Sequence, residues 1–165
     1  MILTRKEILE EIKKSNLKIE PFNPKNVGPV SVDLTLGNEF RIFTKDVIDL
    51  KEDDFKKVTR LIKADKIEIK PGELILGITK EKITMPDYLM GTMSGRSRFA
   101  RVGLLVHMTS NMMQPGISNR EVLEIKNASN SNMILYKGLK VCQIMFEELK
   151  SKEMYKGEFR NQKNL

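Results

Sequence analysis

The chain has 165 residues, of which 40% are hydrophobic and 31% charged, and its formal net charge is +7. This length fits one domain with its own core, and the composition excludes a disordered chain. No apolar run approaches the roughly 18 residues of a membrane span. The early charges at Arg5, Lys6 and Glu7 do not fit a secretory signal, so we expect a cytoplasmic protein with no membrane partner.

The first expected element is a helix over residues 4–14. Thr4 is suited to cap it, and Glu7, three residues later, would complete a capping box. Ile8 and Ile12 then fall on one helical face. The spacing therefore predicts a short N-terminal helix that packs through one apolar side.

A strand is expected next, because Ser31–Leu36 alternates apolar and polar residues with a period of two. Gly37–Asn38 is interpreted as a turn, and Glu39–Phe43 as the returning strand of a hairpin. The charged segment from Asp46 to Lys63 favours neither helix nor strand.

Short strands separated by turn residues occupy most of the remaining chain. Pro71–Gly72 is expected to be one of these turns. Many short strands at close intervals indicate a mainly β barrel or sandwich, and no linker divides residues 1–165 into separate domains. The expected strands are Lys66–Ile69, Leu74–Ile78, Leu104–Met108, Val122–Lys126, Met133–Tyr136 and Val141–Phe146.

The single cysteine and the single histidine limit the chemistry. Cys142 lies in an apolar run and is interpreted as a buried core thiol. One cysteine excludes an internal disulfide and a cysteine-rich zinc site. His107 alone argues against zinc-dependent deamination of the His/Cys type.

The basic segment Gly95–Leu104 is the first candidate for function. It holds Arg96, Ser97, Arg98 and Arg101, whose guanidinium groups and hydroxyl suit a polyphosphate. A solvated basic turn is the alternative. The other positive charges are scattered and form no arginine-rich arm, which argues against nucleic acid as the partner.

A second candidate lies in the stretch from Gln114 to Ile125, where a Pro–Gly turn leads into a strand. If Val122 faces inward, Glu124 shares its face, and a buried carboxylate would have the raised pKa of a general base. The alternative register exposes Glu124. The periodicity leaves both registers open.

The last fifteen residues, Ser151–Leu165, carry no apolar period. They fit either a frayed tail or a mobile lid that orders over a ligand. The composition is unusual for a tail without function, because it includes Tyr155, Phe159, Arg160 and Gln162.

Several segments, taken in order along the chain, resemble a known family. Together they resemble the core of the dCTP deaminases and bifunctional dCTP deaminase/dUTPases, which have a dUTPase-like fold. The segments are Ser31–Gly37, Gly95–Leu104, Val106–Ser110, Gln114–Gly116, Leu123–Asn127, Leu135–Gln143 and Phe159–Gln162.

The resemblance implies a homotrimer with active sites between subunits, zinc-independent chemistry, and magnesium carried by the nucleotide triphosphate. It makes Glu124 the residue that activates water against C4 of cytosine, and Arg101 the residue that orients the base and the water. The substrate-binding positions that it implies are Arg96, Ser97, Val122, Gln143, Tyr155 and Gln162, the last two on the closing tail.

Four positions depart from the family pattern. Arg98 replaces a serine, Gln114 an aspartate, Asn119 a glycine and Glu158 a lysine. Gln114 can hydrogen-bond a sugar hydroxyl but cannot act as a base. Arg98 would add phosphate-binding charge, whereas Glu158 would repel a triphosphate.

These features together predict an enzyme that hydrolyses dCTP to dUTP and ammonia. Two alternatives remain open: a dUTP diphosphatase that releases dUMP and pyrophosphate, and a non-catalytic homologue that only binds or senses nucleotides.

Overall fold

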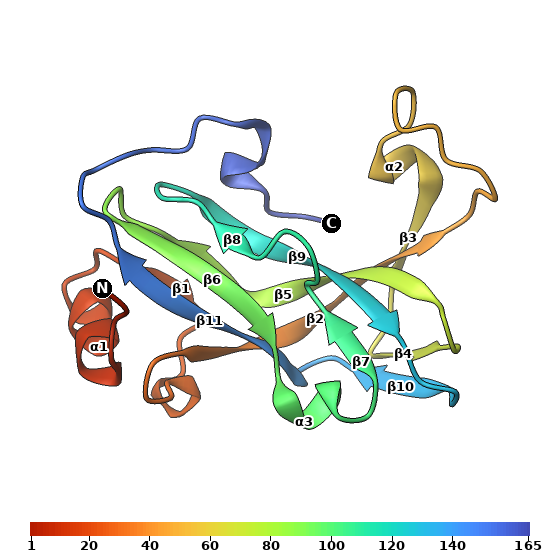
Figure 1. The fold of residues 1–165 in the computed structure, drawn as a ribbon, viewed down its shortest axis with the longest axis horizontal. Coiled ribbons are helices and arrows are strands. Elements are labelled where there is room, and N and C mark those ends of the chain that lie inside the picture. The colour runs from red at the N-terminus through yellow and green to blue at the C-terminus, as the bar shows by residue number, and fades with distance from the viewer.

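The computed structural model describes residues 1–165 and consists mainly of antiparallel β-strands (Figure 1). Nine strands form one sheet, in which β7, β9, β5, β2, β11, β6 and β8 are successive neighbours. β1 pairs with β5 and β3 with β2, while β10 and β4 form a separate two-stranded sheet. The strands are β1 (Lys18–Glu20), β2 (Val32–Phe43), β3 (Thr59–Lys63), β4 (Lys66–Ile69), β5 (Leu74–Thr84), β6 (Leu89–Gly95), β7 (Leu104–Val106), β8 (Met112–Met113), β9 (Ser118–Asn127), β10 (Met133–Tyr136) and β11 (Lys140–Glu148).

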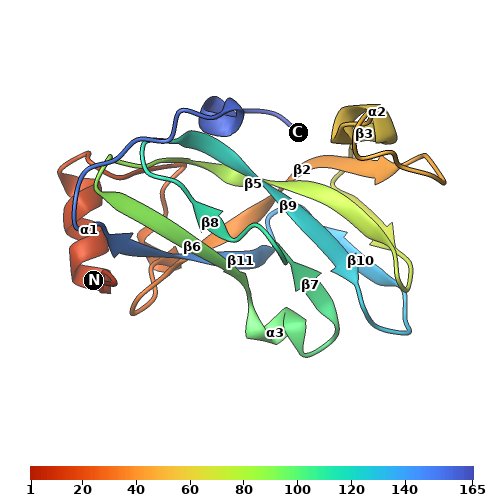
Figure 2. The same ribbon diagram turned by 45° about the horizontal axis from the view of Figure 1, so that its top comes forward.

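The sheet curls until strands from its two ends approach each other (Figures 1 and 2). The end of β6 comes so close to β7 that a Cβ atom on Gly95 would lie 3.6 Å from the carbonyl oxygen of Val106. Alternate residues of β2, including Val32, Leu34 and Leu36, point into the enclosed core and are buried. The predicted mainly β barrel or sandwich is therefore confirmed.

The N-terminal helix is also confirmed. α1 spans Arg5–Lys13, and the backbone N–H of Thr4 donates to Oε2 of Glu7 at 2.7 Å. Ile8 is fully buried against the sheet, and Ile12 packs beside it. The apolar stripe thus places the helix against the outside of the β-structure, as Figure 1 shows.

The hairpin predicted at Gly37–Asn38 is wrong, because β2 runs without a turn from Val32 to Phe43. The pairing of β2 with β5 shifts register between Leu36 and Phe40, so the glycine marks a β-bulge. A Cβ atom on Gly37 would lie 2.9 Å from the carbonyl oxygen of Ile78, which explains why a residue without a side chain stands there.

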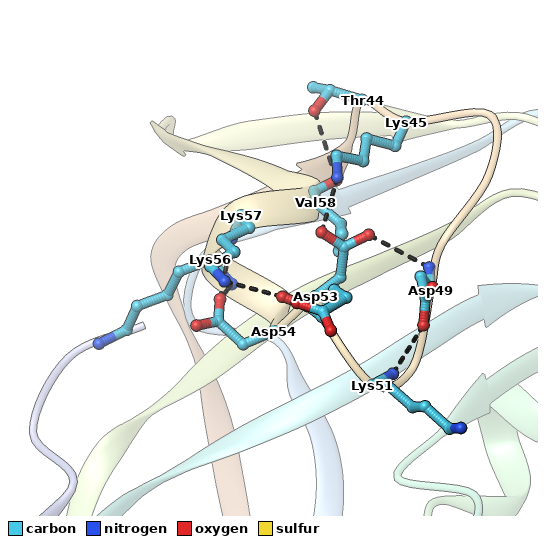
Figure 3. Close-up of polar contacts among 10 residues, drawn as sticks. Thr44, Lys45, Asp49, Lys51, Asp53, Asp54, Lys56, Lys57 and Val58 are labelled. Atoms are coloured by element: carbon cyan, nitrogen blue, oxygen red, sulfur yellow. Dashed lines mark hydrogen bonds and ion pairs between the residues drawn. The ribbon is translucent and has the colours of Figure 1, made fainter.

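The ambiguous segment from Asp46 to Lys63 forms a loop, the short helix α2 (Phe55–Val58) and β3. Asp54 caps α2 by accepting hydrogen bonds from the backbone N–H groups of Lys56 and Lys57, and Asp53 pairs with Lys45 at 2.6 Å (Figure 3). These local contacts hold the position of Phe55, whose ring lines the cleft described below.

Several strands differ from their expected bounds. β6 was not predicted, because its Gly91 and Gly95 and its lack of aliphatic β-branched residues hide the strand signal. β7 ends at Val106 rather than at Met108, since His107 takes a positive φ of 54° and turns the chain away from the sheet. Cys142 is fully buried in β11, as expected.

Candidate functional site

A cleft of about 420 Å³ lies against one face of β9, between this strand, the loop before it and the C-terminal segment. Residues from β9, the loop after β7 and the segment after β11 contribute its walls. The lining residues are Phe55, Leu76, His107, Ser110, Met112, Met113, Gln114, Ile117, Asn119, Glu121, Val122, Glu124, Tyr155, Phe159 and Gln162.

The register of β9 resolves the question that the sequence left open. Leu123 and Ile125 are fully buried in the main core, so Val122 and Glu124 lie on the other face of the strand. This second face is the wall of the cleft. The register that buries Leu123 and Ile125 is therefore the observed one, and it turns Glu124 toward the cleft instead of toward bulk solvent.

The surroundings of the Glu124 carboxylate suit a proton acceptor. Its Oε2 atom is shielded from solvent and has no hydrogen-bond partner, and the same holds for Nδ1 of His107. The two atoms are 3.6 Å apart, which is too long for a hydrogen bond. The backbone N–H of His107 donates to the carbonyl oxygen of Glu124 at 2.8 Å and fixes this pair at the edge of β9.

A second carboxylate, Glu121, lines the same cleft and was missed by the sequence analysis. Opposite this residue, β5 bulges: Val122 pairs with Ile78, but Arg120 pairs with Lys82. The N–H of Glu121 consequently donates to the hydroxyl of a threonine in the bulge, at 2.9 Å, instead of to a strand carbonyl. Bulges re-aim side chains, and here the neighbours Glu121 and Val122 both line the cleft.

The environment of Glu121 disfavours its charged form. Its Oε1 atom is shielded from solvent and has no hydrogen-bond partner. Desolvation by burial raises the pKa of Glu121 to about 7, while a contact with Asn119 opposes that rise. No simple period-two pattern places residues 121 and 124 together, so the sequence of this largely polar strand gave no signal that would single out Glu121.

The cleft is negative although the chain is basic. Its lining holds two glutamates and no lysine or arginine, whereas the formal net charge of the chain is +7. A triphosphate would meet no cation there. The cleft of one chain is therefore suited to a neutral or amine-bearing part of a ligand.

The C-terminal segment packs along the edge of β9 beside the cleft. The backbone N–H of Tyr155 donates to the carbonyl oxygen of Pro115, and that of Arg120 donates to the carbonyl oxygen of Gln162, both at 3.0 Å. Asn119 is buried and donates to the carbonyl oxygen of Phe159 at 2.6 Å. Tyr155 and Gln162 thus line the cleft with Glu124, Val122 and Gln114, as a shared site requires.

The basic segment lies elsewhere, around the short helix α3 (Ser97–Ala100). In both ribbon views α3 is at the opposite end of the molecule from the C-terminal segment (Figures 1 and 2). Arg96 pairs with Asp33 at 2.9 Å, and the guanidinium of Arg98 lies over the ring of Phe99. Ser97, Arg98 and Arg101 are exposed.

Gln143 belongs with this second group. It accepts a hydrogen bond from the hydroxyl of Ser31 and donates to that of Ser94, each at 3.3 Å. It pairs with Asp33 across β11 and β2, next to the ion pair of Arg96. A single chain therefore divides the expected site residues into an acidic cleft and a basic surface at a distance from it.

The chain brings together no group of three or more histidine, cysteine, aspartate or glutamate side chains that would hold a metal ion. None of its helices is long and apolar enough to cross a membrane.

The sequence and the fold match a defined class of proteins. The family model described as dCTP deaminase-like matches residues 2–149. The dUMP-forming dCTP deaminase of Beutenbergia cavernae is 36% identical over 92% of this chain and 81% of its own length. The dCTP deaminase of a Marinomonas species is 38% identical over 90% of this chain and 84% of its own length.

A solved structure shares the fold. The crystal structure of 2'-deoxycytidine 5'-triphosphate deaminase from Agrobacterium tumefaciens superposes with a TM-score of 0.70 at 18% identity, over 88% of this chain. The chain spans 47% of the length of that structure. The chain belongs to the dCTP deaminase-like family.

Proposed function

We propose that this protein hydrolyses dCTP to dUTP and ammonia without zinc. The observation that carries the proposal is Glu124, whose Oε2 atom is shielded from solvent and unpartnered at the wall of a ligand-sized cleft. A carboxylate kept free in this way is available to take a proton from water. The names of the relatives, dCTP deaminase and dUMP-forming dCTP deaminase, support deamination as the reaction.

In the proposed reaction the water oxygen adds to C4 of the cytosine as Glu124 accepts a proton. Glu124 passes this proton to N3 and then carries the hydroxyl proton of the C4 adduct to N4. The C4–N4 bond breaks, the 4-oxo group forms and ammonia leaves. Hydrolysis consumes one water and needs no oxidant or reductant. His107, 3.6 Å from Oε2, limits the space in which the carboxylate can turn and so helps to orient it.

The phosphates need a different surface, because the cleft lacks cations. We assign them to Arg96, Ser97 and Arg98 of a second copy, with Gln143 beside them, and Arg101 of that copy is proposed to orient the base and the attacking water. Exposed apolar side chains near α3, among them Val102 at 59% and Leu105 at 38% exposure, fit an interface between copies. A site whose carboxylates and cations come from two copies agrees with a homotrimer whose sites lie between subunits.

The residues Ser151–Leu165 are proposed to act as the lid of this site, because Tyr155 and Gln162 reach the cleft from a segment with little buried surface. Mg²⁺ is treated as part of the substrate, bound to the triphosphate.

The direct test is to incubate the protein with dCTP, dUTP and Mg²⁺ and to resolve nucleotides, ammonia and pyrophosphate. Ammonia and dUTP from dCTP are the expected products. Binding of both nucleotides without turnover of either would replace the enzyme by a nucleotide-binding homologue.

The shared site has its own test. Glu124→Gln and Arg96→Gln damage different halves, so with dCTP well below saturation Glu124→Gln alone should be nearly inactive and Arg96→Gln alone should keep about a tenth of the activity or less. In a trimer refolded from equal amounts of both, about a quarter of the sites would combine two intact halves and recover activity. Mixtures whose activity does not rise after verified subunit exchange would contradict a site between subunits.

Formation of dUMP is the second candidate, because the Beutenbergia relative is named as dUMP-forming. Gln114 lines the cleft but cannot act as a base. We therefore expect dUTP to accumulate, and Gln114→Asp to raise pyrophosphate release from dUTP. Rapid pyrophosphate release by the unmodified protein would show that Gln114 is no obstacle.

A further inference from the structure

Glu121 is a half-buried ionisable group in the cleft that the proposed reaction does not use. It lines the cleft together with Glu124, at the point where the β5 bulge changes which residues of β9 face it. Its Oε1 atom is shielded from solvent and has no partner, although unpaired buried polar atoms are costly. Apart from the contact with Asn119, the chain offers the Glu121 carboxylate no polar partner, and Oε1 remains available to a ligand group.

The chemistry of the cleft decides what kind of group that is. Above pH 7 Glu121 is mostly ionised, and an ionised carboxylate only accepts hydrogen bonds. Glu121 and Glu124 are the two carboxylates in the lining. Cytosine carries a 4-amino group, which donates, whereas uracil carries a 4-oxo group, which accepts. Two acceptors placed together without a proton repel each other and lose their hydration.

We propose that Glu121 is a specificity-determining residue, which favours the 4-amino group of a cytosine nucleotide over the 4-oxo group of a uracil nucleotide. The inference rests on the proposed function, since it assumes that the base occupies the cleft. Its consequence is that the deaminated product binds more weakly than the substrate and leaves before a second reaction. Glu121 and Gln114 then act in the same direction, toward release of dUTP.

The test measures binding rather than turnover. Dissociation constants for dCTP and dUTP, each with Mg²⁺, are determined at pH 8, where Glu121 is ionised, in a Glu124→Gln background, with and without Glu121→Gln. Glutamine keeps the shape but can donate to the 4-oxo group. The ratio of the dUTP constant to the dCTP constant should fall about tenfold, the equivalent of about 1.4 kcal/mol.

Two further variants sharpen the result. Glu121→Ala removes the repulsion without adding a donor, so its ratio should lie between those of the other two proteins. Glu147→Gln removes one exposed carboxylate from β11, outside the cleft, and should leave the ratio unchanged.

An unchanged ratio in Glu121→Gln, with dCTP still bound, would overturn the inference and leave the proposed function intact. Ammonia release from dCTP by the protein with native Glu121 and Glu124 tests the proposed function separately. If the protein binds neither nucleotide, both proposals fall.

Discussion

The cleft beside β9 and the basic segment around α3 differ in how completely one chain builds them. In the cleft, Glu121 and Glu124 each have an oxygen atom that is shielded and without a partner. In the basic segment, Ser97, Arg98 and Arg101 are exposed, and Arg96 is already paired with Asp33. The fold shields two unpartnered carboxylate oxygens inside one chain but leaves at the surface the basic groups to which we assign the phosphates.

This difference has a physical cause. Desolvation raises the pKa of a carboxyl group, and the curled sheet desolvates Glu121 within one chain. Cations that bind a phosphate need to remain hydrated until the ligand arrives, and an exposed surface is the place for them. A ligand that needs both groups requires two surfaces to meet, and in the proposed trimer they come from different copies.

The largest expected effect follows from substitution of Glu124, which lines the acidic cleft. Glu124→Gln preserves size and shape but removes the ability to take a proton from water. Ammonia release from dCTP should fall by a factor on the order of 10² to 10⁴, while nucleotide binding persists. A coupled ammonia assay and a binding titration measure the two effects, and normal deamination by the variant would refute the catalytic role.

Glu121 should govern how stability depends on pH. Its pKa is raised to about 7 in the folded protein from an ordinary value of 4.5, so the folded state holds the proton more tightly than the unfolded chain. The resulting stabilisation is complete below pH 4.5 and is lost as the pH rises through 7, a difference of about 3 kcal/mol.

Denaturant titrations at pH 5 and pH 8 measure this effect. Glu121→Gln should remove most of the difference between the two pH values, and it should stabilise the protein at pH 8. Glu147→Gln is the exposed control and should behave like the unmodified protein. If Glu121→Gln keeps the full pH dependence, another group is responsible.

Substitutions in the basic segment around α3 should have a smaller effect, and only on the binding of phosphorylated ligands. Arg96→Gln or Ser97→Ala removes a charge-assisted or hydroxyl hydrogen bond worth about 1.5–3 kcal/mol, so dCTP should bind roughly tenfold or more weakly. Deoxycytidine, which lacks phosphates, should bind as before. Calorimetric titration distinguishes these outcomes, and equal losses for both ligands would remove the phosphate assignment.

The smallest expected effect concerns the contact between the C-terminal segment and β9. Asn119 donates to the carbonyl oxygen of Phe159 and accepts from the N–H of Gln162, so Asn119→Ala should free the segment. Each lost bond contributes about 0.5–1.5 kcal/mol. Hydrogen exchange at Gln162 should accelerate, and saturating nucleotide should slow it again.

Asn132→Ala is the matched control, because its side chain bonds Glu68 at the surface, away from the cleft. Exchange at Gln162 that is the same in all three proteins, with or without nucleotide, would remove the lid from the proposed function.

The sequence alone determined the elements whose signals are local. The capping residues and apolar face of α1 depend on residues three and four positions apart, and both were predicted correctly. Short alternating strands indicated the β class, and the ordered motifs indicated the family. Gly37 shows what local signals cannot decide. The sequence marked this residue as a special backbone position, but only the close approach of β5 makes it part of a bulge rather than a turn.

The tertiary structure alone decided what the site looks like. Periodicity along β9 is the same for both faces, so burial of Leu123 in the core was needed to turn Glu124 to the cleft. Glu121 joined it only through a bulge in the neighbouring strand, which no pattern within β9 encodes. The separation of Arg96 from the cleft is likewise a property of the curled sheet, because the distance between two segments depends on the pairing of strands that are remote in sequence.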